Sequence, residues 1–334
     1  MTQPLQPHSI DRIIWWLLAA MAALCLVLGA KLGFRVDPVR ALAPLAGLAA
    51  LAAAIRWGAI RGDARLVAGA TAFLQMTAFT VLGVVLAYAL AAQHGALWDG
   101  WLAAADRRLG FDWPAFYRAA DDAPVLLWIG GIAYHSLTVQ MIACIVVLSI
   151  DGRADRLRLA ILAAIGSGML TILISGAMPA MGNVFDPADF HRLWPSIAWA
   201  ERDLIAGLRS GTLRTLDLTQ LMGIVSFPSY HATLPVILAW AQKDVSFWRI
   251  AAPVWAGVTI VATPLFGGHY GVDVLAGLAL ALAALAIIGR IGETTAMAGS
   301  FAGRARRGYS GGMTAAAAGR RPRAARGGVG DGLV

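Results

Sequence analysis

Long apolar runs constrain the fold of this chain more than any other feature of its sequence. A window of about 19 residues, the length that suits a bilayer core, finds eight candidate membrane spans, at approximately residues 13–33, 41–60, 67–92, 124–150, 157–180, 225–242, 248–267 and 269–290. Runs of about 20 apolar residues match the thickness of the hydrocarbon core of a bilayer. We therefore predict an all-α integral membrane protein with about eight transmembrane helices.

The composition supports a membrane protein and excludes an ordinary soluble domain. Of the 334 residues, 59% are hydrophobic and only 14% are charged, whereas soluble domains are about one-quarter charged. Tryptophans such as Trp15, Trp57 and Trp128 fall near the ends of the predicted spans, where amphipathic rings meet the headgroups. No cleavage pattern interrupts the first run, so we expect it to remain as a membrane anchor.

The basic residues predict the orientation of the chain. With eight spans both termini lie on one side of the membrane, and that side carries 17 of the 27 Lys and Arg residues. The positive-inside rule assigns this side to the cytoplasm. We therefore predict a protein of a bacterial-type inner (plasma) membrane with its other face toward the periplasm.

The chain is predicted to have three parts. Residues 1–66 form a two-helix N-terminal membrane extension, residues 67–290 a six-helix core, and residues 291–334 a disordered basic tail that we do not expect to bind nucleic acid. Within the core, residues 93–123 interleave aromatic and charged side chains, which predicts a segment lying in the membrane interface. Residues 182–224 form a long outer loop.

Two motifs place histidines at the ends of predicted spans. The stretch SFPSYHATLP at 226–235 puts His231 at the head of the sixth span, and GGHYGVDVLAG at 267–277 puts His269 at the head of the eighth. The order of the crossings brings both histidines to the same side of the membrane. Because the spans were located without reference to these motifs, the agreement indicates one shared site.

The residue types in the two motifs predict phosphoryl transfer. His269 and Asp273 are four residues apart, so on a helix the carboxylate can fix the imidazole tautomer and leave the other nitrogen as an oriented nucleophile. His231 can donate a proton to a departing oxygen. Gly267 and Gly268 are expected to leave backbone N–H groups at a helix start open to an anion. This chemistry requires neither a metal nor another cofactor.

The two motifs can also be interpreted without catalysis. A single His-x-x-x-Asp pattern is more often a packing pair than an active site, and a transporter or scaffold could use polar groups within the membrane without chemistry. The joint occurrence of both motifs at neighbouring spans favours catalysis, because ionisable groups near membrane depth are costly and are kept for function. Asp106, Arg107 and Arg108 have a simpler expected role, as the solvated face of an interfacial helix.

The motifs FPSYHA and GGHYGVDVLAG, about 40 residues apart, resemble those of the type-2 phosphatidic acid phosphatase superfamily. The likeness is closer to its branch of inositol phosphorylceramide synthase and similar inositolphosphotransferases, which DRRLGFDWPAF at 106–116 also resembles. The resemblance covers roughly residues 67–290. It implies that His269 is the nucleophile, that Asp273 supports it, and that His231 protonates the leaving group of a phospholipid or sphingolipid substrate.

The sequence departs from the phosphatase members at their basic residues. Ala262 and Thr263 stand where those members have a Ser-Arg pair, and residues 174–183 lack a Lys or Arg. A phosphodiester carries one negative charge and needs less compensation than a phosphomonoester dianion. The departure therefore favours transfer of a phospho-headgroup between lipids. The alternative is a lipid phosphatase that acts on phosphatidate or a polyprenyl diphosphate.

The remaining predicted substrate contacts come from the same motifs and from the outer loop. Arg192, Arg202 or Arg209 is predicted to supply the missing positive charge, and Ser229 and Tyr270 are predicted to contact the substrate beside the histidines. The sequence leaves open the identities of the donor and acceptor lipids and the oligomeric state.

Overall fold

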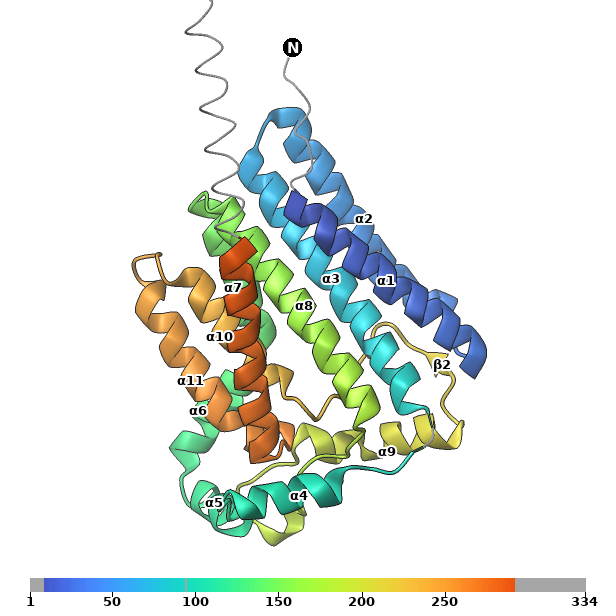
Figure 1. Ribbon diagram of the computed structural model, residues 1–334, viewed down its shortest axis with the longest axis vertical. Helices are drawn as coiled ribbons and strands as arrows, with labels where there is room; N and C mark the ends of the chain where they lie inside the picture. The colour runs from blue at the N-terminus through green and yellow to red at the C-terminus, as the bar shows by residue number, and fades with distance from the viewer. Residues whose placement is uncertain (1–8, 94, 292–334) are drawn as a thin grey trace, which may run out of the picture. The chain divides into compact units, whose positions relative to one another are not determined.

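The computed structural model describes residues 9–93 and 95–291 of the chain (Figure 1). The chain divides into two compact units, residues 1–288 and residues 289–334, and the fold described below is that of the first. The predicted disordered tail lies, apart from Ile291, outside the described residues.

Helices long enough to cross a membrane dominate the described residues. Two helices, α6 (Pro124–His135) and α7 (Leu137–Ile150), meet at an angle of 57°, and together they are also long and apolar enough to cross a membrane. The chain is therefore an all-α integral membrane protein, which confirms the predicted class. Six single helices among the described residues are long and apolar enough to span: α1 (Ser9–Leu32), α2 (Pro38–Arg61), α3 (Ala64–Ala91), α8 (Ala154–Ala177), α11 (Trp248–Gly267) and the helix Gly271–Ile291, which we call the last helix.

The predicted count of eight spans is approximate. The sixth predicted span corresponds to α10 (Tyr230–Gln242), which has 13 residues. At 1.5 Å per residue this helix rises about 20 Å, less than the roughly 30 Å core of a bilayer. It is short because residues 225–229 are not helical: Pro228 restricts the residue before it, and Ser229 is the N-cap.

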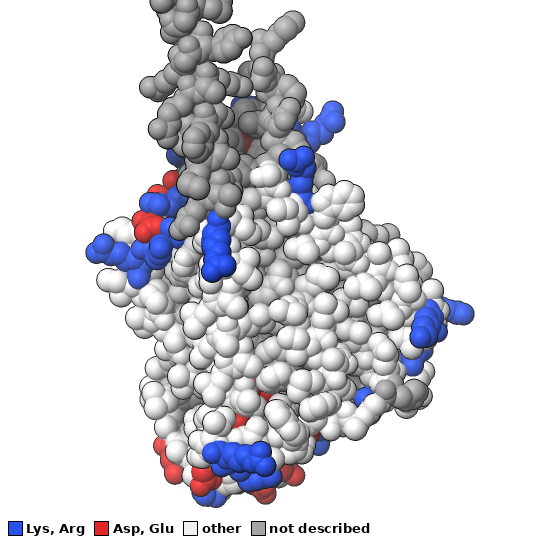
Figure 2. Space-filling model, viewed as in Figure 1, with Lys and Arg blue, Asp and Glu red and all other residues white. Residues whose placement is uncertain are grey.

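Successive long helices run in alternating directions, and three shorter ones lie across one end of the bundle (Figure 1). These are α4 (Asp99–Arg108), α5 (Trp113–Asp121) and α9 (Ile197–Ser210). On the face shown in Figure 2, charged side chains gather toward the ends of the helices and leave a largely uncharged belt between them. This distribution is the one that a bilayer-spanning bundle requires.

The outer loop is fastened to the connection between α1 and α2. The two-residue strands β1 (Arg35–Val36) and β2 (Thr215–Leu216) pair in parallel, and the short 3-10 helix η1 (Pro187–Asp189) lies earlier in the same loop. Close by, Arg40 and Asp217 form an ion pair at 3.7 Å. The N-terminal pair of helices thus holds the segment that leads into α10.

Small residues bring α3 and α8 into close contact. A Cβ atom on Gly168 would lie 2.3 Å from the ring of Phe79, and one on Gly176 would lie 2.7 Å from Leu90. Glycine at both positions allows the two helices to pack closely without a strong hydrophobic driving force, as small residues do in membranes. This contact forms one wall beside His231.

Candidate active site

The structure brings His231 and His269 together, although they come from different elements. His231 lies in the first turn of α10, and His269 lies in the turn between α11 and the last helix. The centroids of their rings are 6.4 Å apart. The segment that carries His269 contacts α4 and α9, which lie across one end of the bundle (Figure 1).

Asp273 stands behind His269 and is held from several sides. Its Oδ2 lies 3.4 Å from Nδ1 of His269 and accepts hydrogen bonds from the Ser226 hydroxyl at 2.9 Å and the Tyr270 N–H at 3.0 Å. The Asp273 side chain is fully buried, and only 4% of His269 is exposed. The carboxylate therefore has a fixed position from which it can orient the imidazole.

Asp106 fixes the start of the last helix. Its carboxylate accepts hydrogen bonds from the N–H groups of Gly271 and Val272, each at 2.8 Å, and from the indole N–H of Trp113, also at 2.8 Å. A carboxylate at this position satisfies amides that have no partner within the helix and interacts favourably with the helix dipole. Gly271 leaves room for the ring of Phe111, which a Cβ atom would approach to 2.5 Å.

The prediction of a solvated face is correct for Arg107 and Arg108, which are exposed, and wrong for Asp106, which is fully buried. The sequence did carry a signal for the buried role, since Trp113 follows Asp106 by seven residues within an aromatic cluster. Charge alone was the wrong guide, because a carboxylate with three donors is stable away from water.

The expected role of Gly267 and Gly268 is also wrong. Gly267 ends α11 instead of beginning a helix, and Gly268 caps α11 in the left-handed conformation with φ 69°, donating its N–H to the Pro264 carbonyl. The amides at the start of the next helix are occupied by Asp106. The two glycines instead permit close packing, because Cβ atoms would lie 2.8 Å from the Tyr134 hydroxyl and 2.5 Å from Cβ of Ala198.

His231 packs on an aromatic ring, and the start of α10 that carries it packs on the last helix. The ring of Tyr134 stacks on its imidazole, with centroids 4.3 Å apart and planes inclined by 15°. The preceding Ser229 is fully buried, and its N–H donates to the Asp273 carbonyl at 3.0 Å. A Cβ atom on Gly277 would lie 2.3 Å from the Ser229 carbonyl, so the two helix starts touch through their backbones.

A cavity of about 160 Å³ lies beside His231. Its walls come mainly from α3 and α8, with Gly83 and Gly168 leaving space between the helices. Thr171 lines the cavity, and its buried hydroxyl has no hydrogen-bond partner among the described residues. The cavity is thus largely apolar and has one unsatisfied polar group.

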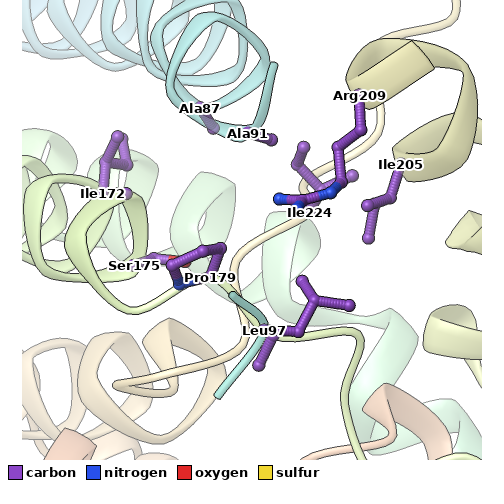
Figure 3. Close-up of a pocket in the computed structure, with 11 residues that line it drawn as sticks. Ala87, Ala91, Leu97, Ile172, Ser175, Pro179, Ile205, Arg209 and Ile224 are labelled. Atoms are coloured by element: carbon purple, nitrogen blue, oxygen red, sulfur yellow. The ribbon is translucent and has the colours of Figure 1, made fainter. Parts of the chain in front are cut away.

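The predicted arginines lie apart from one another. Arg192 is exposed, and its backbone N–H donates to Asp121. The guanidinium of Arg202 stacks 3.4 Å from the Trp199 ring. Arg209 extends from α9 into a small pocket of about 20 Å³ (Figure 3). Within the described chain, none of the three is bonded to His231, His269 or Asp273.

Tyr270 belongs to a wide depression of about 930 Å³ on the same end of the bundle. Its hydroxyl donates a hydrogen bond to Asp99 at 3.2 Å, and Asp99 also accepts hydrogen bonds from the backbone N–H groups of Met181 and Gly182. Arg202 contributes to the same depression. Tyr270 therefore fastens the turn of His269 to α4 and to the loop after α8.

Glu201 is a buried acid that the sequence analysis did not single out. It lies on α9 with 6% of its surface exposed, and its Oε1 has no hydrogen-bond partner among the described residues. Burial raises the pKa of Glu201 to about 8. The amphipathic pattern of α9 could have revealed it, because Glu201 shares the buried face of Ala198, Ile205 and Leu208.

Comparison with known proteins gives one result. A family model described as PAP2 superfamily matches residues 100–287, more than half of the chain. The matched range contains both histidines, Asp273 and Asp106. Comparisons with curated proteins and with solved structures gave no match.

Replacement of Asp106 tests its role as a helix cap. Asp106→Ala leaves three buried donors without an acceptor, and each such loss costs about 1–3 kcal/mol. We expect the melting temperature of the purified protein to fall by several degrees, whereas Arg107→Ala at the exposed neighbouring position leaves it within about 1 °C. An Asp106→Ala protein as stable as the wild type would contradict this role.

The buried carboxyl of Glu201 predicts a dependence of stability on pH. Its stabilising contribution is complete below the unfolded pKa of about 4.5, decreases as the pH rises, and is fully lost above the folded pKa of about 8. The difference in melting temperature between Glu201→Gln and the wild type should therefore grow in favour of the variant from pH 5 to pH 9. A constant difference across this range would refute the assignment.

Proposed function

The chain belongs to the PAP2 superfamily, and on this basis we propose that it is a lipid phosphotransferase that moves a phospho-headgroup through a phosphohistidine intermediate. Membership indicates a membrane-embedded enzyme of the phosphatase or phosphotransferase kind that acts on lipid-like substrates. The observation that carries the finer proposal is the 6.4 Å separation of the His231 and His269 rings, with Asp273 behind only His269.

In the proposed first step, Nε2 of His269 attacks the phosphorus of a phospholipid donor. The bond between phosphorus and the oxygen of the lipid alcohol breaks, and His231 gives its proton to that departing oxygen. Asp273, whose Oδ2 lies 3.4 Å from Nδ1 of His269, supports the positive charge that the ring acquires. The product of this step is a phosphohistidine that retains the headgroup.

In the second step an acceptor alcohol attacks the phosphohistidine. His231, now neutral, takes the proton of the acceptor, and the bond between phosphorus and His269 breaks. The headgroup is thereby transferred, and both histidines return to their starting states. Ser226 and Tyr270 hold Asp273 in place during both steps.

The cavity beside His231 supports departure of the lipid alcohol on that side. It holds about 160 Å³ between two membrane helices and is largely apolar. The glycerol or sphingoid end of a lipid matches such walls better than a hydrated headgroup does. The phospho-headgroup accordingly remains on His269, toward the polar end of the bundle.

Scarcity of positive charge supports a phosphodiester as the substrate. Within the described residues, no Lys or Arg side chain bonds to either histidine or to Asp273, and the sequence has Ala262 and Thr263 where the phosphatase members that it resembles have a Ser-Arg pair. A monoester dianion would lack compensation at such a site. A lipid phosphatase remains the second candidate, favoured by the superfamily itself.

We place the site at the periplasmic face of a bacterial-type inner membrane. The support is the distribution of basic loops, since Arg153 and Arg156 precede or begin α8 and Lys243 follows α10, at the end of the bundle opposite α4, α5 and α9 (Figure 1). The positive-inside rule assigns that opposite end to the cytoplasm.

Purified protein assayed on radiolabelled phospholipids in the presence of EDTA tests the mechanism. We expect turnover to persist with EDTA and to fall by at least about 10²-fold in His269→Ala and in His231→Ala. His191→Ala is the matched control, because this exposed histidine lies in the outer loop and should leave turnover unchanged. Turnover that survives His269→Ala, or that chelation abolishes, rules out the mechanism.

The same assay separates the candidate functions. A phosphotransferase requires an acceptor lipid and releases little inorganic phosphate, whereas a phosphatase releases phosphate without an acceptor. A transporter or scaffold tolerates the double change of His231 and Asp273 to alanine, which a catalyst does not.

A further inference from the structure

Glu201 occupies a position next to the proposed active site. The first turn of α9 packs on the turn before His269, since a Cβ atom on Gly268 would lie 2.5 Å from Cβ of Ala198 and 3.1 Å from the Ser196 hydroxyl. Glu201 follows Ala198 by three residues, so the two side chains share one face of α9. Glu201 therefore lies on the face of α9 that packs toward the turn carrying His269.

Electrostatic contacts connect Glu201 to the core. Its carboxyl interacts with the side chains of Tyr88 on α3 and Tyr134 on α6. The ring of Tyr134 in turn stacks on His231, and the Tyr134 hydroxyl lies beside Gly267. Tyr134 is therefore within electrostatic range of Glu201 and in direct contact with His231.

The carboxyl of Glu201 has no counterion in the described parts of the chain. No ion pair or hydrogen bond of its side chain is present there, and Oε1 is buried without a partner. A buried carboxylate in this state is strongly unfavourable, so the group is stable only as a neutral acid or with a ligand. The carboxylates of Asp106 and Asp273 each accept hydrogen bonds from the chain, whereas the carboxyl of Glu201 accepts none from the described residues.

The backbone N–H groups at the start of the last helix are not available as donors to the substrate phosphate. The N–H groups of Gly271 and Val272 are bonded to Asp106, and the Tyr270 N–H is bonded to Asp273. Basic residues are missing from positions 262–263 and 174–183. A protonated carboxylic acid supplies an O–H donor without adding a negative charge near the phosphate.

We propose that Glu201 binds the substrate as a neutral carboxylic acid that donates a hydrogen bond to a non-bridging phosphate oxygen. This inference rests on the proposed function, because it requires a phosphate ester at the histidines. It assigns to α9 a direct role in substrate binding and replaces the arginine contact that the sequence predicted. It also favours a monoanionic diester, since a dianion would draw the proton from the acid.

Burial supports the proton that this role requires, because it raises the pKa of Glu201 to about 8. The titratable groups that interact with it are Tyr88 of α3 and Tyr134 of α6. His269 lies in the turn against which α9 packs, and Arg202 and Asp203 are its charged neighbours on α9. All five groups remain in a Glu201 variant, so a difference between pH profiles reports Glu201.

The test compares Glu201→Gln, Glu201→Leu and the wild type on bis(4-nitrophenyl) phosphate in detergent micelles from pH 6 to pH 9.5. For the wild type we expect kcat/KM to fall about tenfold per pH unit above about pH 8. Glutamine keeps an N–H donor, so its kcat/KM should stay within roughly threefold of wild type at pH 7 and lack this decline. Leucine should lower kcat/KM roughly tenfold or more at pH 7, also without the decline.

Asp203→Asn is the matched control, because Asp203 is an exposed acid on the same helix, and this variant should retain the wild-type profile. Leucine is compatible with the buried face of α9, so we expect Glu201→Leu to fold. Equal melting temperatures of Glu201→Leu and the wild type verify this. If kcat/KM of Glu201→Gln still declines at alkaline pH, or if Glu201→Leu is fully active, the inference about Glu201 is overturned and the proposed function is not affected. Absence of turnover that depends on His269 in the wild type overturns the proposed function and the inference with it.

Discussion

The arrangement of the site depends on two buried carboxylates at the start of the last helix. Asp106 takes the amides of Gly271 and Val272, and Asp273 takes the amide of Tyr270 and the hydroxyl of Ser226. Buried polar groups in a membrane protein must find partners within the chain, because no water is available to them. These bonds therefore fix the turn that carries His269, and through Ser229 they fix the start of α10.

Because of these hydrogen bonds, the start of the last helix cannot bind an anion through its own amides. A free helix N-terminus binds phosphate through its amides and dipole, but here the protein's own carboxylates occupy that position. Substrate recognition then depends on side chains around the histidines. In our account these are His231 as a proton donor and Glu201 as a neutral acid, with the apolar cavity receiving the lipid.

The sequence predicted the fold class well, because apolar runs of bilayer length leave few alternatives. It also placed His231 and His269 at one end of the bundle, since the order of crossings depends only on the spans. It misjudged Asp106 and Gly268, whose roles depend on long-range partners: Asp106 lies 165 residues from Gly271 in the chain. It missed Glu201, because a single acid on an amphipathic helix is apparent only when the buried face is known.

Direct detection of the covalent intermediate tests the central claim most closely. Wild-type protein is mixed with a phospholipid that carries a labelled headgroup, the reaction is stopped within milliseconds at alkaline pH, and peptides are analysed by mass spectrometry. The account predicts the labelled phospho-headgroup on His269, and none on any peptide of the His269→Ala protein. Label found on His231 or on a residue outside the site, or turnover without label on His269, would contradict it.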